Sequence, residues 1–222
     1  MFLAQLDRVS NHHNGNSNKQ LHSHVAIEKT LAPIATATIA HQKYVTASLV
    51  LAFINDPIMR WMYPDPYQYL AHFPRFIEVF GGKSFLKKTA YCIDGYFGAA
   101  LWFPPGVEPD VEPLIKLFEQ SIFKFDRADM FAILEQMEHY HIKESHWYLS
   151  LIGVDPTQQG KGYGSALIQQ VTTQCDRDRL PAYVEASKPA NVLFYERHGF
   201  QAIGTIQAGK SPSIFPMVRQ PQ

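Results

Sequence analysis

The feature that most constrains this chain is the glycine-rich turn in "GVDPTQQGKGYGSALIQQV", residues 153–171. An apolar run that includes Leu149, Leu151 and Val154 precedes the turn, ends at Pro156 and is typical of a buried strand. After the turn, apolar residues recur at helical spacing, at Ala166, Leu167, Ile168, Val171 and Cys175. Residues 157–162 therefore join a strand to the N-terminus of a helix.

The same turn is suited to an anion. The first N–H groups of a helix have no partner within the helix and lie at the positive end of its dipole, and glycine lets an anion approach them. Two familiar phosphate loops have another spacing, since Lys161 is followed by Gly162 rather than Ser or Thr, and Ser165 stands where a dinucleotide fingerprint needs its third glycine. The turn indicates a phosphate site of a different kind, and a ligand-free glycine turn is the alternative.

Length and composition indicate how this chain is organised into domains. Its 222 residues, 46% of them hydrophobic, suffice for one large domain, which we expect over residues 25–222. The stretch "SNHHNGNSNKQLHSH" is polar and low in complexity, so residues 1–24 are expected to form a flexible arm. Histidines on such an arm fix no geometry, and no metal site is predicted from His12, His13, His22 and His24.

Charge and cysteine usage bear on the partners and on the location of the protein. The formal net charge of +0 gives no basic excess for nucleic acid or for an anionic membrane surface. Cys92 and Cys175 lack a metal-binding spacing, and the sequence shows neither a secretory pattern nor an apolar run long enough for a bilayer. We therefore expect a soluble, cytoplasmic protein.

The order of the expected elements indicates an α/β fold with a mixed sheet. Residues 25–39 are ambiguous, with an edge strand as one interpretation. Two strand-like segments, 84–94 and 96–104, meet at Asp94-Gly95, a strong hairpin signal. The remaining expected elements are helices over 44–54 and 67–80, one or two helices over 111–141, a strand over 146–154, a helix over 162–177, a strand over 182–187, a helix over 191–198, and strands near 200–207 and 213–219.

Two segments, "HWYLSLIGVDPTQQGKGYGSALI" and "PAYVEASKPANVLFYERHGFQAIG", resemble the cofactor half of the GNAT acetyltransferase superfamily. Gln159, Gly162 and Gly164 fit its [QR]-x-x-G-x-[GA] signature, and "NVLFYERHGF" fits its closing helix. Within the superfamily the chain is most similar to the puromycin N-acetyltransferase type. The resemblance is strong over about residues 146–207 and weak back to about residue 44. It implies a three-layer fold with a splayed, mostly antiparallel central sheet between helices.

The resemblance also implies that acetyl-CoA is the cofactor. It assigns the pyrophosphate to backbone amides of the turn, with Ser165 opening the helix, that is, to Gln159, Gly160, Lys161, Gly162, Tyr163, Gly164 and Ser165. Around Gly153, the edge amides of Ile152 and Val154 are implied to pair with pantetheine. Asn191 matches a position that bonds the pantetheine arm; a helix N-cap near Pro189 is the alternative.

Direct acetyl transfer to an amine needs a base, donors for the oxyanion and an acid for the thiolate. Tyr195 matches the acid of the family, with simple aromatic packing as the alternative, and the Ile152 N–H is the expected oxyanion donor. Glu185 shares a strand face with Tyr183 and Ser187, so it either attracts or deprotonates the acceptor, or is a solvated carboxylate. A second source of bases, or simply polar surface, is the group Glu138, His139, His141, Glu144 and His146.

The acceptor expected from the resemblance is the primary amine of a small molecule, bound between the first helices and the hairpin. Asp56 is a candidate partner for its charge, and aromatic candidates are Trp61, Tyr63 and Trp102, which at their spacing also suit a core. A catalytically silent acyl-CoA-binding domain is the second hypothesis, and a nucleotide-binding module is a third that the loop spacing disfavours. Exposed aromatics in the first half would permit a homodimer.

Overall fold

The computed structural model describes residues 32–123 and 126–222, so the predicted arm and its histidines lie outside the described residues. The described strands form one seven-stranded sheet in the order β1-β2-β3-β4-β5-β7-β6, in which β4 and β5 are parallel and the other neighbours antiparallel. The strands are β1 Ile34–Thr36, β2 Ala90–Ile93, β3 Gly98–Phe103, β4 Trp147–Val154, β5 Ala182–Ala186, β6 Phe200–Ala202 and β7 Phe215–Arg219. The predicted mixed α/β fold is confirmed.

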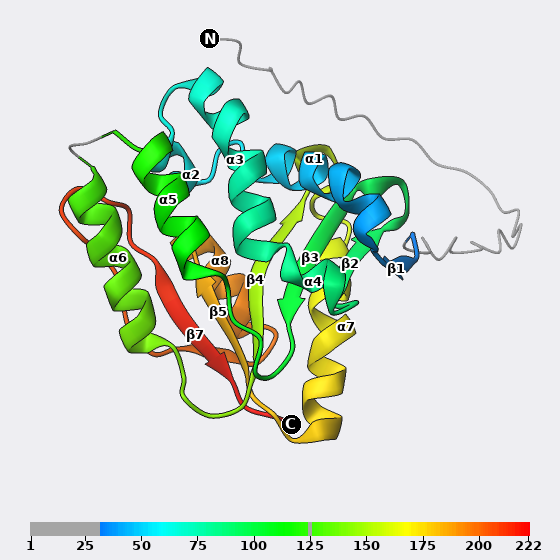
Figure 1. Ribbon diagram of the computed structural model, residues 1–222. Helices are drawn as coiled ribbons and strands as arrows, with labels where there is room; N and C mark the ends of the chain where they lie inside the picture. The colour runs from blue at the N-terminus through cyan, green and yellow to red at the C-terminus, as the bar shows by residue number, and fades with distance from the viewer. Residues whose placement is uncertain (1–31, 124–125) are drawn as a thin grey trace, which may run out of the picture. The chain divides into compact units, whose positions relative to one another are not determined.

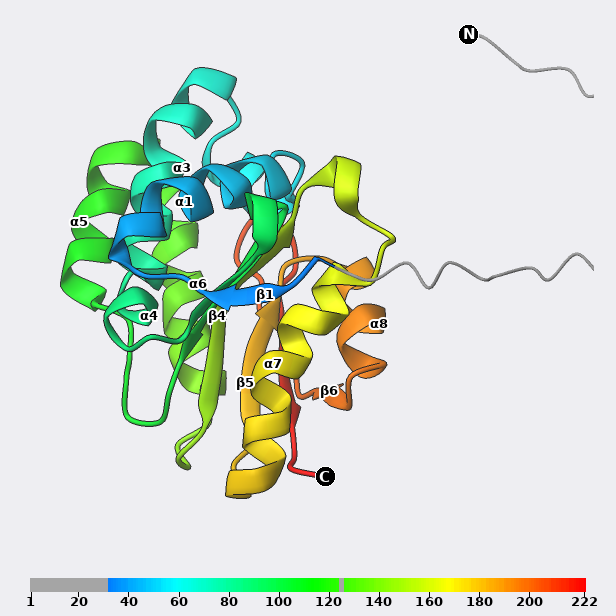
Figure 2. The same cartoon turned by 90° about the vertical axis from the view of Figure 1, so that its right-hand side faces the viewer.

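Helices cover both faces of the sheet (Figures 1 and 2). One face carries α1, α3, α4, α5 and α6, and the other carries α7 and α8, so the sheet is the middle of three layers. The helices are α1 Gln42–Ala52, α2 Pro57–Met62, α3 Pro66–Gly81, α4 Lys83–Leu86, α5 Val111–Ser121, α6 Arg127–Tyr140, α7 Tyr163–Asp178 and α8 Pro189–Glu196. Each layer boundary is filled by its own cluster of buried apolar side chains.

Two short helices differ from the sequence expectation. Helix α1 ends at Ala52, before the Asn55-Asp56-Pro57 sequence expected to end it. This sequence instead begins α2, because Asp56 caps α2 by accepting from the N–H groups of Ile58 and Met59, and Pro57 fits the first helical position. The strand predicted from residue 84 was wrong at its start, since residues 83–86 form α4 and β2 begins at Ala90. Phe85 is buried against the core in α4, and the chain turns at Lys88, whose φ is +59°.

The central sheet is splayed between β4 and β5. Their parallel pairing covers Trp147–Leu149 against Ala182–Val184. Beyond these residues, β4 continues along β3 as far as the Gly98–Val154 pair, while Glu185 and Ala186 pair with β7. The two strands therefore separate at Ser150 and Glu185, and this opening positions the site described next.

Candidate active site

A groove of about 440 Å³ lies where β4 and β5 separate. Its walls come from the end of β4, the glycine turn, the first turn of α7 and one side of α8. Most of the predicted cofactor residues line it, namely Ile152, Gly153, Val154, Gln159, Gly160, Gly162, Tyr163, Gly164, Ser165, Asn191 and Tyr195. The splayed strands thus bring together residues that are as much as 43 positions apart in the sequence, from 152 to 195.

The glycine turn has the backbone of an anion cradle. Gly160 and Gly162 have φ angles of +75° and +89°, in the left-handed region that favours glycine. Gly162 is the N-cap of α7 and has no side chain, so no side-chain cap occupies the N–H groups of the first turn of this helix. Asp155 fixes the entry to the turn, accepting from the backbone N–H of Thr157 at 2.7 Å. The pyrophosphate expected from the sequence fits this cradle.

The amides at the end of β4 point into the groove on alternate residues. The Asp155 N–H donates at 2.8 Å to the carbonyl of Phe97, the residue just before β3, so the N–H groups two and four residues earlier also face β3. The N–H groups of Ile152 and Val154 consequently face away from β3, toward the side on which β5 has left the strand. These are the two edge amides that the sequence assigned to pantetheine.

Several predicted cofactor residues have structural partners of their own. Lys161 does not line the groove, and its Nζ lies 2.6 Å from Gln158 Oε1. The Gln159 side chain donates to the Val154 carbonyl at 3.1 Å, and Ser165 Oγ lies 3.0 Å from His198 Nε2. A Cβ at Gly153 would lie 2.5 Å from the Cβ of Ala52, so this glycine also lets α1 approach β4.

Two cationic residues of the groove were missed at the sequence level. Lys188 is the N-cap of α8 and Arg197 follows its last turn, and both line the groove. Their only sequence signal is that they bracket the helix that carries Asn191 and Tyr195. Since Lys188 is the N-cap, the alternative assignment of Asn191 as the helix cap was wrong, and its side chain instead lies 3.5 Å from Ser187 Oγ.

A second cavity, of about 100 Å³, shares part of its lining with the first. The two share Phe53, Ile152, Asn191 and Tyr195 in their linings. The second cavity lies on the sheet face covered by α3, α5 and α6, and aliphatic, methionine and phenylalanine side chains make up most of its wall. Among the described residues, its polar lining is confined to Ser150, Glu185, Ser187, Asn191 and Tyr195.

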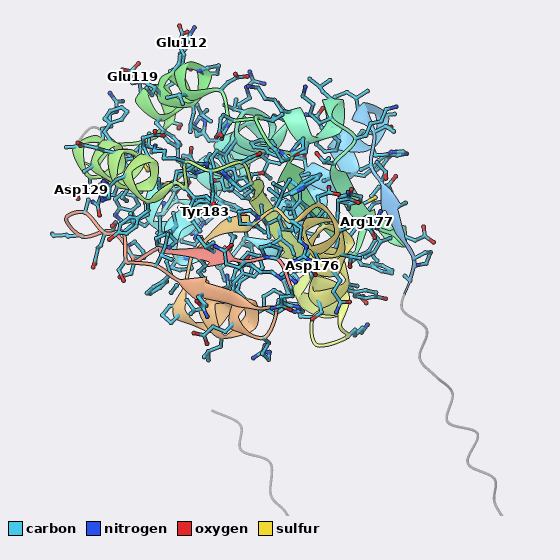
Figure 3. The ribbon with its side chains drawn as sticks, turned by 90° about the horizontal axis from the view of Figure 1, so that it is seen from below. Glu112, Glu119, Asp129, Asp176, Arg177 and Tyr183 are labelled. Atoms are coloured by element: carbon cyan, nitrogen blue, oxygen red, sulfur yellow. The ribbon has the colours of Figure 1, made fainter. Side chains whose placement is uncertain are left out.

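Glu185 is the acidic residue of this apolar cavity. Its Oε1 is fully buried and has no hydrogen-bond partner among the described residues. Burial raises the pKa of this carboxyl to about 7, although the nearby Tyr148 and Tyr183 hydroxyls oppose the rise. Figure 3 shows Tyr183 inside the molecule, whereas Glu112 and Glu119 of α5 lie at its outer surface. A carboxyl with this pKa is half-ionised near neutral pH and is suited to accept a proton.

Tyr195 lies where the two cavities meet. Its side chain is 4% exposed, and burial raises its pKa well above the ordinary value for a phenol, with Asp56 and Glu185 adding to the rise. Tyr195 is therefore a neutral phenol at neutral pH, a state in which its hydroxyl can donate a hydrogen bond. This placement brings the predicted acid within the same opening as the Ile152 amide and Glu185.

The predicted acceptor residues fall into two groups, those that line one of the cavities and those that line neither. Asp56 lines the groove, but one of its oxygens caps α2 and the other accepts from Ser187 Oγ at 2.5 Å. Trp61, Tyr63 and Trp102 are absent from the linings of both cavities. Tyr63 is buried with its hydroxyl 2.9 Å from Ser121 Oγ, and Trp102 is buried in the core under α7, on the opposite face of the sheet. Helical or strand spacing alone does not separate core aromatics from cavity aromatics.

The histidine group before β4 lies outside both cavities. His141 Nε2 is 3.1 Å from His146 Nε2, and the rings of Tyr148 and Tyr183 pack against His141, at centroid distances of 5.1 and 4.8 Å. Burial lowers the pKa of His141 to about 4, so its imidazole is neutral at neutral pH. The two tyrosines thus separate this group from Glu185, and the described residues contain no cluster of three or more metal-ligating side chains.

The known proteins to which this chain is similar include acetyltransferases. The sequence profile of the acetyltransferase (GNAT) domain matches residues 130–220. An uncharacterized N-acetyltransferase of Schizosaccharomyces pombe is 25% identical over 199 residues, which cover 81% of this chain and 80% of the relative.

None of the helices within 32–123 and 126–222 is long and apolar enough to cross a membrane.

Two solved structures share the fold. A histone acetyltransferase HPA2-related acetyltransferase from Corynebacterium glutamicum is 24% identical, with a TM-score of 0.61 over 87% of this chain and 98% of that one. Arylalkylamine N-acetyltransferase 2 from Aedes aegypti is 12% identical, with a TM-score of 0.60 over 86% and 99%. None of these relatives supports the narrower resemblance to the puromycin N-acetyltransferase type. Residues 130–220 of this chain are therefore similar in sequence to the acetyltransferase (GNAT) domain, and the chain shares its fold with these two solved structures.

Proposed function

We propose that this protein is an acetyl-CoA-dependent N-acetyltransferase, which moves an acetyl group to the primary amine of a small molecule by direct attack in a ternary complex. The observation that carries the proposal is the junction of the groove and the apolar cavity at Phe53, Ile152, Asn191 and Tyr195. A silent acyl-CoA-binding domain needs the groove alone. A buried carboxylate in an adjoining cavity favours a catalytic role.

The groove has donors for each part of the cofactor. Backbone N–H groups of the turn and of the first turn of α7 bind the pyrophosphate, and each such charge-assisted bond contributes about 1.5–3 kcal/mol. Lys188 and Arg197 add positive charge beside the phosphates. The Ile152 and Val154 amides and the Asn191 side chain bind the pantetheine arm. Bound acetyl-CoA supplies the acetyl group as a thioester, which an amine attacks directly.

The residues at the junction and Glu185 of the adjoining cavity divide the chemical roles. Glu185 holds the acceptor ammonium and removes its proton, because its buried Oε1 has no hydrogen-bond partner among the described residues. The Ile152 N–H stabilises the negative charge that develops on the acetyl oxygen. As the new C–N bond forms, the thioester C–S bond breaks, and Tyr195, whose side chain lines both cavities, donates a hydrogen bond from its phenol to the departing thiolate. Asp56 is a positioning residue, since both of its oxygens are engaged in holding α2 and Ser187.

Calorimetric titration with acetyl-CoA, ATP and NAD tests the proposal, because the chain offers a matched pair of glycines. Gly160 and Gly106 both have a φ of +75° and open space around an added Cβ, but Gly160 alone of the two lines the groove. We expect the wild type to bind acetyl-CoA selectively, Gly160→Glu to lose this binding and Gly106→Glu to keep it. Equal loss in both variants, or no acetyl-CoA binding by the folded wild type, would contradict the proposal.

A further inference from the structure

We infer that the acceptor is a monoamine with an uncharged, apolar body, and this inference rests on the proposed function. The body enters the 100 Å³ cavity, and the single amino group lies beside Glu185, which lines this cavity together with the junction residues Asn191 and Tyr195. Acceptors with a second charge, such as polyamines, amino acids and peptide lysines flanked by polar backbone, are disfavoured. The inference depends on the charge content of the cavity wall and on its depth in the core.

The wall offers a partner for one cation and for no anion. Glu185 is the acidic residue that lines the cavity, and the described lining contains no lysine, arginine or histidine. A second ammonium or a carboxylate on the acceptor would enter the cavity without a partner, and burial of an unpaired charge is strongly unfavourable. The remaining polar groups, Ser150, Ser187, Asn191 and Tyr195, offer hydrogen bonds but no full charge.

The position of Glu185 sets the orientation of the acceptor. Glu185 lies on β5 just beyond the last residue that pairs with β4, and Ser187, Asn191 and Tyr195, which follow it along the chain, also line the cavity. Three of these residues are close to the groove, since Asn191 and Tyr195 line both spaces and Ser187 bonds the groove residue Asp56. The amine therefore faces the groove, and the rest of the molecule extends beneath α3, α5 and α6.

The opposite end of the cavity is apolar and adaptable. Phe76, Phe118 and Ile133 come from α3, α5 and α6, and their side chains are at most 6% exposed. Four methionines, Met59, Met62, Met130 and Met137, also line the cavity. Methionine side chains are unbranched and flexible, so the wall accommodates alkyl chains or rings larger than the space it encloses. Each methylene that an acceptor buries is expected to raise kcat/KM about threefold to fourfold.

Matched amines test the inference directly. We expect kcat/KM for hexylamine to exceed that for propylamine about tenfold or more, and that for 1,6-diaminohexane and 6-aminohexanoate about a hundredfold. Calorimetric binding of the amines to the protein loaded with coenzyme A, which has no acetyl group to transfer, is expected to follow the same order. Comparable use of hexylamine and 1,6-diaminohexane would overturn the inference, and so would acetyl-CoA binding without turnover of any apolar amine. A protein that fails to bind acetyl-CoA would instead contradict the proposed function.

A variant that fills the cavity tests whether the apolar body of the acceptor binds in this cavity or whether the protein merely prefers apolar amines. Met137 is half-buried on α6 and lines the cavity, so Met137→Trp is expected to lower kcat/KM for hexylamine at least tenfold and that for propylamine less than threefold. Ile115→Trp is the control, because Ile115 is half-buried on α5 outside the cavity lining. Equal losses for the two amines in Met137→Trp, with the melting temperature preserved, would place the acceptor elsewhere.

Discussion

Tyr195 differs from a conventional acid because it is buried. A phenol titrates above a thiol even in water, and burial moves the pKa of Tyr195 further up, which weakens full proton transfer and leaves hydrogen-bond donation as its main contribution. We expect Tyr195→Phe to lower kcat about 10²- to 10⁴-fold with little change in the Kd of acetyl-CoA. Steady-state kinetics with calorimetry measures both. Tyr91→Phe, outside both cavities, is the control, and unchanged kcat in Tyr195→Phe would remove this residue from the mechanism.

The charge of Glu185 serves the proposed reaction, but its burial lowers the stability of the fold. Its carboxylate is required as a base, so kcat/KM is expected to rise with pH through about 7, the pKa to which burial raises this group. Glu185→Gln should remove this dependence and lower kcat about 10²-fold or more. The control is Glu196→Gln, an exposed carboxyl on α8, which should leave the pH profile in place. An unchanged profile in Glu185→Gln would assign the base elsewhere.

The same substitution is expected to stabilise the fold at alkaline pH. The pKa of Glu185 is higher in the folded than in the unfolded chain, so the folded state binds more protons and the free energy of unfolding falls as pH rises from about 4.3 to about 7. Glu185→Gln removes the buried charge and should raise the free energy of unfolding at pH 8 by about 1–2 kcal/mol. Chemical denaturation at pH 5 and pH 8 measures this, and a larger gain at pH 5 would contradict it.

At the scale of the elements, α8 carries charge to both sides of the groove. Lys188 and Arg197 lie at opposite ends of this helix and line the same groove. Replacing both with Gln should weaken acetyl-CoA binding about tenfold or more and flatten its dependence on salt, since each cation contributes a screened attraction to phosphate. S-acetyl-pantetheine has no phosphate and serves as the control ligand. An equal loss of affinity for both ligands would show that the substitutions disturb the groove rather than its charge.

The elements with long periodic patterns could be predicted from sequence, whereas the shortest could not. The helix expected over 162–177 and the strand expected over 146–154 lie within one residue of α7 and β4. Their apolar residues repeat over two or more turns or pleats. By contrast, α2 and α4 have six and four residues, too few for a period to show. Their positions depend on the cap at Asp56 and on the burial of Phe85, which is a tertiary effect.

The same limit applies to predicting the candidate site from the sequence. The glycine turn is a local signal, and its left-handed glycines and helix N-terminus follow from a short stretch of sequence. Glu185 could be placed on a face by strand alternation, but its burial depends on how β4 and β5 separate. Trp61, Tyr63 and Trp102 share the spacing of cavity residues and lie outside the cavity linings. Packing between elements that are distant in the sequence decides whether an apolar residue faces the cavity or the core.

At the scale of the whole molecule, the splayed sheet needs a connection besides its own hydrogen bonds. Few residues pair β4 with β5, yet β5, β7 and β6 carry Glu185 and the strand end that leads to α8. Arg219 of β7 provides such a connection, because its Nη1 and Nη2 bind the Asp176 carboxylate of α7 at 2.6 and 2.8 Å. Helix α7 packs on β2, β3 and β4, so this ion pair joins the two parts of the sheet.

This connection predicts an acid-sensitive stability. Arg219 is 4% exposed, and Asp176→Asn would leave its guanidinium buried without an anion, so we expect a loss of about 3 kcal/mol in the free energy of unfolding. The guanidinium holds the pKa of Asp176 below its usual value, so the contribution is complete above about pH 4 and disappears as pH falls through the folded pKa. Denaturant unfolding from pH 3 to 7 measures the difference.

The control for this prediction is Asp178→Asn, an exposed carboxyl two residues further along α7, which should change the free energy of unfolding by less than about 0.5 kcal/mol. If the ion pair joins the two parts of the sheet, Asp176→Asn should also weaken acetyl-CoA binding, because the groove lies between those parts. A destabilised protein with unchanged affinity for acetyl-CoA would limit the pair to general stability. Equal effects in Asp176→Asn and Asp178→Asn would show that the charge of α7, rather than the buried contact, is responsible.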